Sequence, residues 1–85
     1  MKTFDYVIKD PIGIHSRPAG DVVKKAKEFN SEITIKKGDK TASAKQLFAL
    51  MKLGVKCGDS IVVVANGEDE EKAIAEMQTL LEEKF

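Results

Sequence analysis

The chain contains one histidine and one arginine, and they lie two positions apart, as His15 and Arg17. Ser16 and Pro18 favour a helix start here, because serine caps a first turn and proline loses no hydrogen bond there. The first turn of a helix has unpaired backbone N–H groups and a partial positive charge, which together bind phosphate readily. That charge disfavours the imidazolium, so a ring nitrogen keeps the lone pair that a nucleophile needs. The pattern therefore indicates that His15 could carry a phosphoryl group, with the N–H groups of Ser16 and Arg17 and the Arg17 guanidinium at its oxygens.

A second interpretation of the same residues stays open. A single histidine beside a helix start is more often a surface or capping residue than a nucleophile, and the Ser16 hydroxyl is better explained as a cap of the first turn. The sequence contains no other catalytic set. It has no glycine-rich phosphate loop, no paired metal-ligand spacing, and no second histidine that could activate Cys57 as a nucleophile. We therefore expect no metal site and no cofactor.

A short helix predicted at residues 46–53 is the second informative segment. It is apolar on nearly all sides, so one buried face cannot use all of its side chains. We expect part of the set Leu47, Phe48 and Met51 to be exposed as a docking patch, since phenylalanine and methionine anchors recur at protein interfaces. The alternative is a helix wedged deep in the core.

The remaining pattern predicts the elements that must position these residues. Alternating or β-branched runs indicate strands at residues 3–9, 32–36, 41–44 and 61–65, with a hairpin at 37–40 and the last strand the most buried. A helix is predicted from Ser16 to a stop at Asn30, and a last helix begins at the acidic residues 68–71. The order β-α-β-β-α-β-α predicts one domain over residues 1–85, with an antiparallel sheet covered by helices on one face.

Length and composition exclude several classes of protein. The 85 residues are 42% apolar and 33% charged with zero net charge, which argues against disorder and against a dedicated nucleic-acid binder. Every apolar run, including the one at 61–65, is far shorter than the roughly 20 residues of a membrane span, so we expect no membrane insertion. A single cysteine cannot form an internal disulfide, which favours a cytoplasmic protein. Residues 1–45 carry a local excess of basic side chains and residues 46–85 an acidic excess, a pattern typical of two solvated faces.

Two segments together resemble a known family. Residues 13–19 (GIHSRPA) are similar to the active-site signature of the histidine-containing phosphocarrier proteins, the HPr family of the bacterial sugar phosphotransferase system, and residues 45–54 (KQLFALMKLG) resemble the family's second signature. The resemblance covers essentially the whole chain. It implies an α+β open-faced β-sandwich with four antiparallel strands in the order 1-4-2-3 and three helices on one face. The residues alone permit a ferredoxin-like order equally well.

The resemblance also implies a function. The chain would be a carrier and not an enzyme, and would act in the cytoplasm as a monomer. His15 would accept a phosphoryl group on Nδ1 from phosphorylated enzyme I and pass it to the A component of sugar-specific enzyme II complexes, while Arg17 steadies the group. The docking surface implied by the family comprises Leu47, Phe48 and Met51, with Gly20, Lys24 and Lys27 beside them. The basic first half could steer the chain onto acidic partners.

Three departures from the family pattern stand out. Gln46 replaces a serine that a kinase phosphorylates in many members, so that regulation should be absent here. Ser43 lies nearby, and Ser43 with Gln46 matches a capping box. Gly20 is costly inside a helix, and close approach of a partner could explain it. Ser16 stands where alanine or threonine is common.

The alternative function is a regulatory protein that docks on a regulator or kinase through the same surface without transfer.

Overall fold

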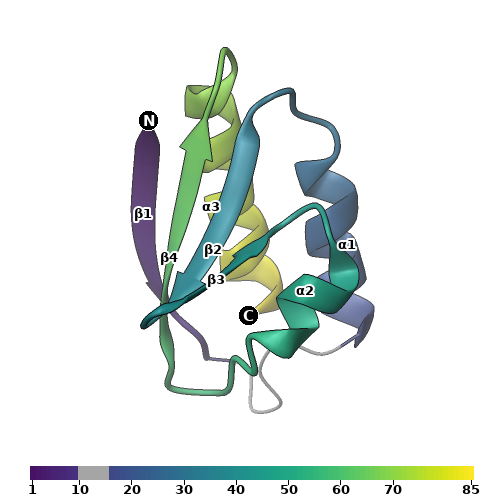
Figure 1. Ribbon diagram of the computed structural model, residues 1–85, viewed down its shortest axis with the longest axis vertical. Helices are drawn as coiled ribbons and strands as arrows, with labels where there is room; N and C mark the ends of the chain where they lie inside the picture. Colours follow the sequence, from purple (N-terminus) through teal and green to yellow (C-terminus); the bar gives the residue numbers. More distant parts are fainter. Residues whose placement is uncertain (10–15) are drawn as a thin grey trace.

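The computed structural model of the chain describes residues 1–9 and 16–85, and for residues 16–18 the backbone alone. Within these residues the elements follow the predicted order (Figure 1). They are β1 (Lys2–Val7), α1 (Ser16–Ala26), β2 (Glu32–Lys37), β3 (Lys40–Ser43), α2 (Leu47–Lys52), β4 (Ser60–Asn66) and α3 (Glu70–Lys84). The predicted strands and helices are therefore confirmed, with shifts of a few residues at their ends.

The four strands form one antiparallel sheet in the order β1-β4-β2-β3. This is the order that the family resemblance implied, and it excludes the ferredoxin-like alternative. The last strand in the chain is central, and its Val63 pairs with Phe4 on one side and Ile35 on the other. Figure 1 shows all three helices on one face of the sheet, so the other face is open.

The core lies between that sheet face and the helices. In β4 the residues Ile61, Val63 and Ala65 are fully buried, whereas Val62 and Val64 are only partly buried on the open face. The strand is thus buried on one side only, although its sequence is a continuous apolar run. The helices supply buried apolar residues to this core: Ala19, Val22, Val23 and Ala26 from α1, and Ala73, Met77 and Leu81 from α3.

The ends of α1 and β1 differ from the sequence prediction because other hydrogen bonds replace the regular pattern there. α1 ends at Ala26 and not at Asn30, since the chain tightens into bonds from Glu28 N–H to the Lys25 carbonyl and from Phe29 N–H to the Ala26 carbonyl. β1 ends at Val7 because the next backbone N–H groups donate to the carbonyls of Asp59 and Phe85.

The predicted capping box at Ser43 and Gln46 is wrong. Ser43 is the last residue of β3, and its hydroxyl accepts a hydrogen bond from the Lys45 backbone N–H at 3.2 Å. Gln46 itself is the N-cap residue of α2 and makes no side-chain capping bond. The serine lies three residues too early because a turn separates β3 from α2, with the Gln46 N–H bonded to the Ser43 carbonyl.

The predicted turns are confirmed. Lys37 pairs with Lys40 at the end of the β2–β3 hairpin. Gly54 follows α2 with a φ of 66°, a left-handed conformation that glycine adopts without the Cβ penalty of other residues. In the part of the chain described, no helix is both long and apolar enough to cross a membrane.

Candidate functional site

The predicted phosphoryl site lies at the start of α1. The helix begins at Ser16, the residue directly after His15, as the sequence predicted. His15 itself lies outside the described residues, as do the side chains of Ser16 and Arg17. The backbone supplies the helix N-terminus, and its first turn contains no acidic residue to oppose an anion. The roles of these three side chains therefore stay predictions.

α1 is fixed in place on both sides. Its buried residues pack on the sheet, and two ion pairs link its outer side to α3. Lys25 Nζ lies 3.4 Å from Glu76 Oε1, and Lys84 Nζ lies 3.8 Å from Asp21 Oδ2. Because these pairs are partly exposed, they orient the helix more than they stabilise it. α1 from Ala19 onward is therefore held against the rest of the fold.

α2 packs against α1 and β3 and presents apolar side chains to solvent. Phe48 is 79% exposed and Met51 39% exposed, while Leu50 is fully buried on the opposite side of the same helix. Leu47 is partly buried and packs on the core. The prediction of an exposed apolar surface is confirmed for Phe48 and Met51, and the alternative of a helix wedged deep in the core is wrong. We call Leu47, Phe48 and Met51 the α2 patch.

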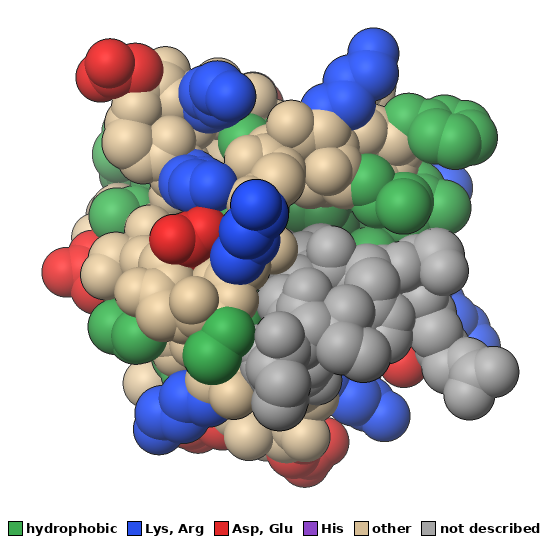
Figure 2. Space-filling model, turned by 90° about the horizontal axis from the view of Figure 1, so that it is seen from below, with side chains coloured by type: hydrophobic (Ala, Val, Ile, Leu, Met, Phe, Trp, Pro, Cys, Tyr) green, Lys and Arg blue, Asp and Glu red, His purple; other side chains and the backbone are tan. Residues whose placement is uncertain are grey.

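The α2 patch and the start of α1 belong to the same end of the molecule. In Figure 1, α2 crosses the half of α1 that contains its N-terminus. Figure 2 views this end directly, and hydrophobic side chains gather at the corner of this face where α2 lies, with basic side chains nearby. An apolar cluster bordered by charged groups is the usual composition of a protein docking surface.

The other predicted docking residues lie along α1. Lys24 is exposed near the C-terminal end of α1, about 12 Å along the axis from Ser16 at 1.5 Å per residue. Lys27 is exposed in the turn that follows the helix, so it is farther still from the predicted site. Gly20 is half-buried, and a Cβ added to it would meet no atom within 4 Å. Packing within the described part of the chain therefore does not require glycine at this position.

Lysine side chains hold both ends of α2, a feature that sequence reasoning missed. Lys45 Nζ donates to the Phe29 carbonyl at 2.9 Å, and Lys37 Nζ donates to the Gly54 carbonyl at 2.8 Å. Lys37 also lies 3.0 Å from Asp59 Oδ2. The backbone N–H of Lys56 and the Lys37 ammonium both hold the pKa of the Asp59 carboxyl below its ordinary value. No local motif signals these contacts, since the partners are 16, 17 and 22 residues apart in the chain.

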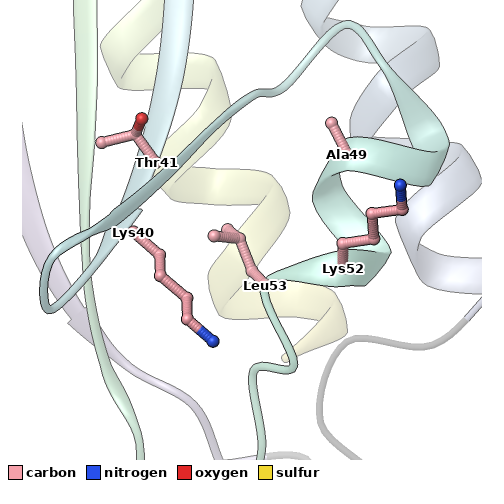
Figure 3. Close-up of a pocket in the computed structure, with 5 residues that line it drawn as sticks. All are labelled: Lys40, Thr41, Ala49, Lys52 and Leu53. Atoms are coloured by element: carbon pink, nitrogen blue, oxygen red, sulfur yellow. The ribbon is translucent and has the colours of Figure 1, made fainter.

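A shallow pocket of about 370 Å³ lies between β3 and α2. It is lined by Lys40, Thr41, Ala49, Lys52 and Leu53, and Figure 3 shows the two lysine side chains running in different directions, with their ammonium groups far apart in the view. It therefore lacks the convergent polar groups of a small-molecule site. Among residues 1–9 and 16–85, no cluster of three histidine, cysteine or acidic side chains could hold a metal ion.

The sequence matches the family model described as "PTS HPr component phosphorylation site" over residues 2–83. The chain belongs to the HPr family. A curated relative, the phosphocarrier protein HPr of Borreliella burgdorferi, is 47% identical over 76 residues, which are 89% of this chain and 88% of the relative. The family's members are phosphocarrier proteins of the phosphotransferase system, and the fold described above is theirs.

Solved structures of the HPr family agree with that assignment. The crystal structure of HPr-C-His from Thermoanaerobacter tengcongensis superposes with a TM-score of 0.94 at 40% identity. The match covers all of this chain and 96% of the HPr-C-His chain. Crh of Bacillus subtilis, named for catabolite repression and described as a dimer with a swapping domain, superposes with a TM-score of 0.79 at 30% identity, covering 93% and 91% of the two chains. Both likenesses extend over nearly the whole fold.

Proposed function

We propose that the chain carries a phosphoryl group on His15, which it accepts from phosphorylated enzyme I and delivers to the A component of sugar-specific enzyme II. The observation that carries this proposal is the place of His15 in the chain, directly before the first residue of a helix whose first turn contains no acidic residue. Membership in the HPr family supports it.

In the proposed transfer, the neutral imidazole supplies the electron pair. A bond forms from Nδ1 of His15 to phosphorus while the donor's bond to phosphorus breaks, and that bonding pair stays with the donor. The backbone N–H groups at the start of α1 and the Arg17 guanidinium then face the phosphoryl oxygens. Each contact at a partly exposed helix end contributes only about 0.3–1 kcal/mol, so the group is held but can still be passed on.

The α2 patch is the proposed contact with both partners, with Gly20, Lys24 and Lys27 beside it. Its exposure on a helix packed against α1 would let a partner cover the patch and reach the start of α1 together. The exposed lysines would increase the rate of encounter with an acidic partner surface. We propose that the chain acts as a monomer in the cytoplasm, because one copy contains both the acceptor and the docking surface.

The alternative is a regulatory protein that docks through the same surface without transfer. The likeness to Crh, named for catabolite repression, motivates it. The retention of His15 beside Arg17 favours the carrier, since a purely regulatory protein has no need of a nucleophile at this position.

Phosphorylation by a defined donor tests the proposal. Incubation with phosphoenolpyruvate and enzyme I is expected to add one acid-labile phosphate per chain, and His15→Ala is expected to abolish it. Intact mass before and after mild acid treatment measures the label, and gel filtration of the same sample measures the oligomeric state. A stable phosphate on the His15→Ala chain would contradict the carrier function. Docking to a regulator without any phosphorylation of the wild-type chain would favour the alternative.

A further inference from the structure

α2 cannot hold its own position. It spans six residues, Leu47–Lys52, whereas isolated helices shorter than about 12 residues are marginal in water. Phe48 is 79% exposed and so contributes little packing energy to the helix, and Met51 is partly exposed. Its N-cap residue makes no side-chain capping bond. Leu50 anchors the middle of the helix in the core, and the contacts at its two ends add to this anchor in setting where the α2 patch lies.

The C-terminal end of α2 is closed by a short hydrogen-bond network. The Leu53 N–H donates to the Leu50 carbonyl at 3.3 Å and the Gly54 N–H donates to the Met51 carbonyl at 3.2 Å. The Gly54 carbonyl accepts a hydrogen bond from the Lys37 ammonium at 2.8 Å. A cation at this end also opposes the partial negative charge of the helix C-terminus. The network thus links the exit of α2 to the last residue of β2.

Asp59 completes the network and holds it in place. Its Oδ2 lies 3.0 Å from Lys37 Nζ and accepts the Lys56 backbone N–H at 2.8 Å. Its own carbonyl accepts the Ile8 N–H at 3.0 Å, and the neighbouring Gly58 N–H donates to the Ile8 carbonyl at 2.8 Å. The carboxylate therefore belongs to a loop whose backbone is hydrogen-bonded to Ile8, the residue directly after β1. Lys37 Nζ lies between a fixed carboxylate and the carbonyl at the end of α2.

We propose that Lys37, anchored by Asp59, is a positioning residue for the docking surface: it sets the place of α2 by binding the Gly54 carbonyl. The two side chains are 30% and 32% exposed, so their ion pair by itself adds little to global stability. Its effect lies in geometry, since the ammonium ties the Gly54 carbonyl at the exit of α2 to the carboxylate of Asp59. The expected effect on phosphoryl transfer rests on the proposed function, whereas the effect on the position of α2 does not.

The test compares Lys37→Met with Lys36→Met in the full-length chain. Methionine keeps an unbranched stem and removes the ammonium. Lys36 is the matched control because it is adjacent in β2 and exposed, and it has no ion pair among the described residues. Lys37→Arg is the conservative rescue, since it restores a cation to the same acceptors. Asp59→Asn removes the anchoring charge without touching β2.

The first measurement needs no partner. Amide hydrogen exchange of α2 is expected to become faster by on the order of fivefold in Lys37→Met, the loss of about one hydrogen bond, while exchange in β4 stays unchanged. Asp59→Asn should give a smaller increase in α2, Lys37→Arg should restore most of the protection, and Lys36→Met should match the wild type. Unchanged exchange in α2 of Lys37→Met would overturn the proposal, as would an equal increase in Lys36→Met.

The second measurement is phosphoryl transfer with phosphorylated enzyme I as the donor. Lys37→Met should raise KM on the order of fivefold with kcat unchanged, because α2 contacts the partner and not the phosphoryl group. A global loss of folding would lower the active fraction without this split. If KM stays at the wild-type value, the positioning role is wrong although the carrier function stands. If the wild-type chain accepts no phosphate, the carrier function is wrong, and the exchange measurement alone decides whether Lys37 positions α2.

Discussion

Asp69 and Ser31, 38 residues apart in the chain, are joined through one carboxylate. Asp69 Oδ1 accepts the Ser31 backbone N–H at 2.9 Å and also the Ser31 hydroxyl, while Oδ2 accepts the Asn30 N–H at 2.9 Å. Asp69 is the N-cap residue of α3, and its partners lie in the turn between α1 and β2. One side chain thus satisfies backbone donors where two helices and a strand meet, and Ser31 is the only polar residue of the described chain that is fully buried.

Removing that carboxylate is expected to make folding less sensitive to acid. The Ser31 hydroxyl, followed by the Asn30 N–H, holds the pKa of Asp69 below its ordinary value of 3.8. Between the lowered and the ordinary value the unfolded chain binds more protons, so the free energy of unfolding decreases as the pH falls through this range. Asp69→Asn should therefore lower stability at neutral pH and flatten its decrease in acid. Urea unfolding at a series of pH values measures both effects.

Asp39→Asn provides the control for that titration. Asp39 is exposed in the β2–β3 hairpin and makes no hydrogen bond or ion pair among the residues described. The Asp39→Asn change should leave both the stability at neutral pH and its dependence on acid unchanged. Some acid dependence should remain even in Asp69→Asn, because the pKa values of Asp59 and Glu70 are also lowered by their hydrogen bonds. An Asp69→Asn curve parallel to the wild type would contradict the prediction.

Gly67→Ala is expected to destabilise the chain by about 1–3 kcal/mol, the usual cost of forcing extra atoms into a packed site. Gly67 has a φ of 157°, and a Cβ added to it would lie 2.7 Å from the Cα of Ser31. The Oγ and Cβ of the buried Ser31 are similarly close, at 2.7 and 3.0 Å, so no long flexible side chain can move aside. The free energy of unfolding in urea measures the cost.

Gly20→Ala is the matched control at a second glycine. It lies inside α1 with no atom within 4 Å of a new Cβ, so alanine should increase stability by roughly 0.5–1 kcal/mol through its better helix propensity. Two Gly→Ala changes in one small chain are thus expected to have opposite signs. Equal effects at Gly20 and Gly67 would show that close packing at Ser31 is not the cause.

Phe48→Ala is expected to separate docking from folding. The side chain is 79% exposed, so its removal should change the free energy of unfolding by no more than about 0.5 kcal/mol. Phosphoryl transfer should slow by at least about fivefold, the effect of losing an aromatic interface anchor. A time course of phosphoryl transfer from phosphorylated enzyme I measures the rate, and urea unfolding measures the stability.

Leu50→Ala in the same helix should behave in the opposite way. Leu50 is fully buried, and truncation of a core leucine costs about 2–5 kcal/mol. Its loss of stability should be large, while molecules that remain folded keep the α2 patch. Unchanged transfer in Phe48→Ala would show that partners do not use the α2 patch.

The sequence by itself determined the elements and their order. Alternation marked β2, because local periodicity records which face of an element is covered, and Ser16 with Pro18 marked the start of α1. It also placed His15 directly before a helix start and predicted an exposed apolar surface on α2, since Phe48 and Met51 exceed what one buried face can use. The strand order came only through the family resemblance.

Only the tertiary structure decided how the ends of the elements are held. The apolar run in β4 could not reveal which of its side chains lie on the open face of the sheet, and the Ser43 and Gln46 pattern suggested a capping box that a turn excludes. The contacts from Lys37 to Gly54, from Lys45 to Phe29 and from Asp69 to Ser31 have no local signature. Hydrophobic periodicity is a property of neighbouring residues, whereas a side chain that satisfies a distant backbone group depends on which segments the folded chain brings within 3 Å.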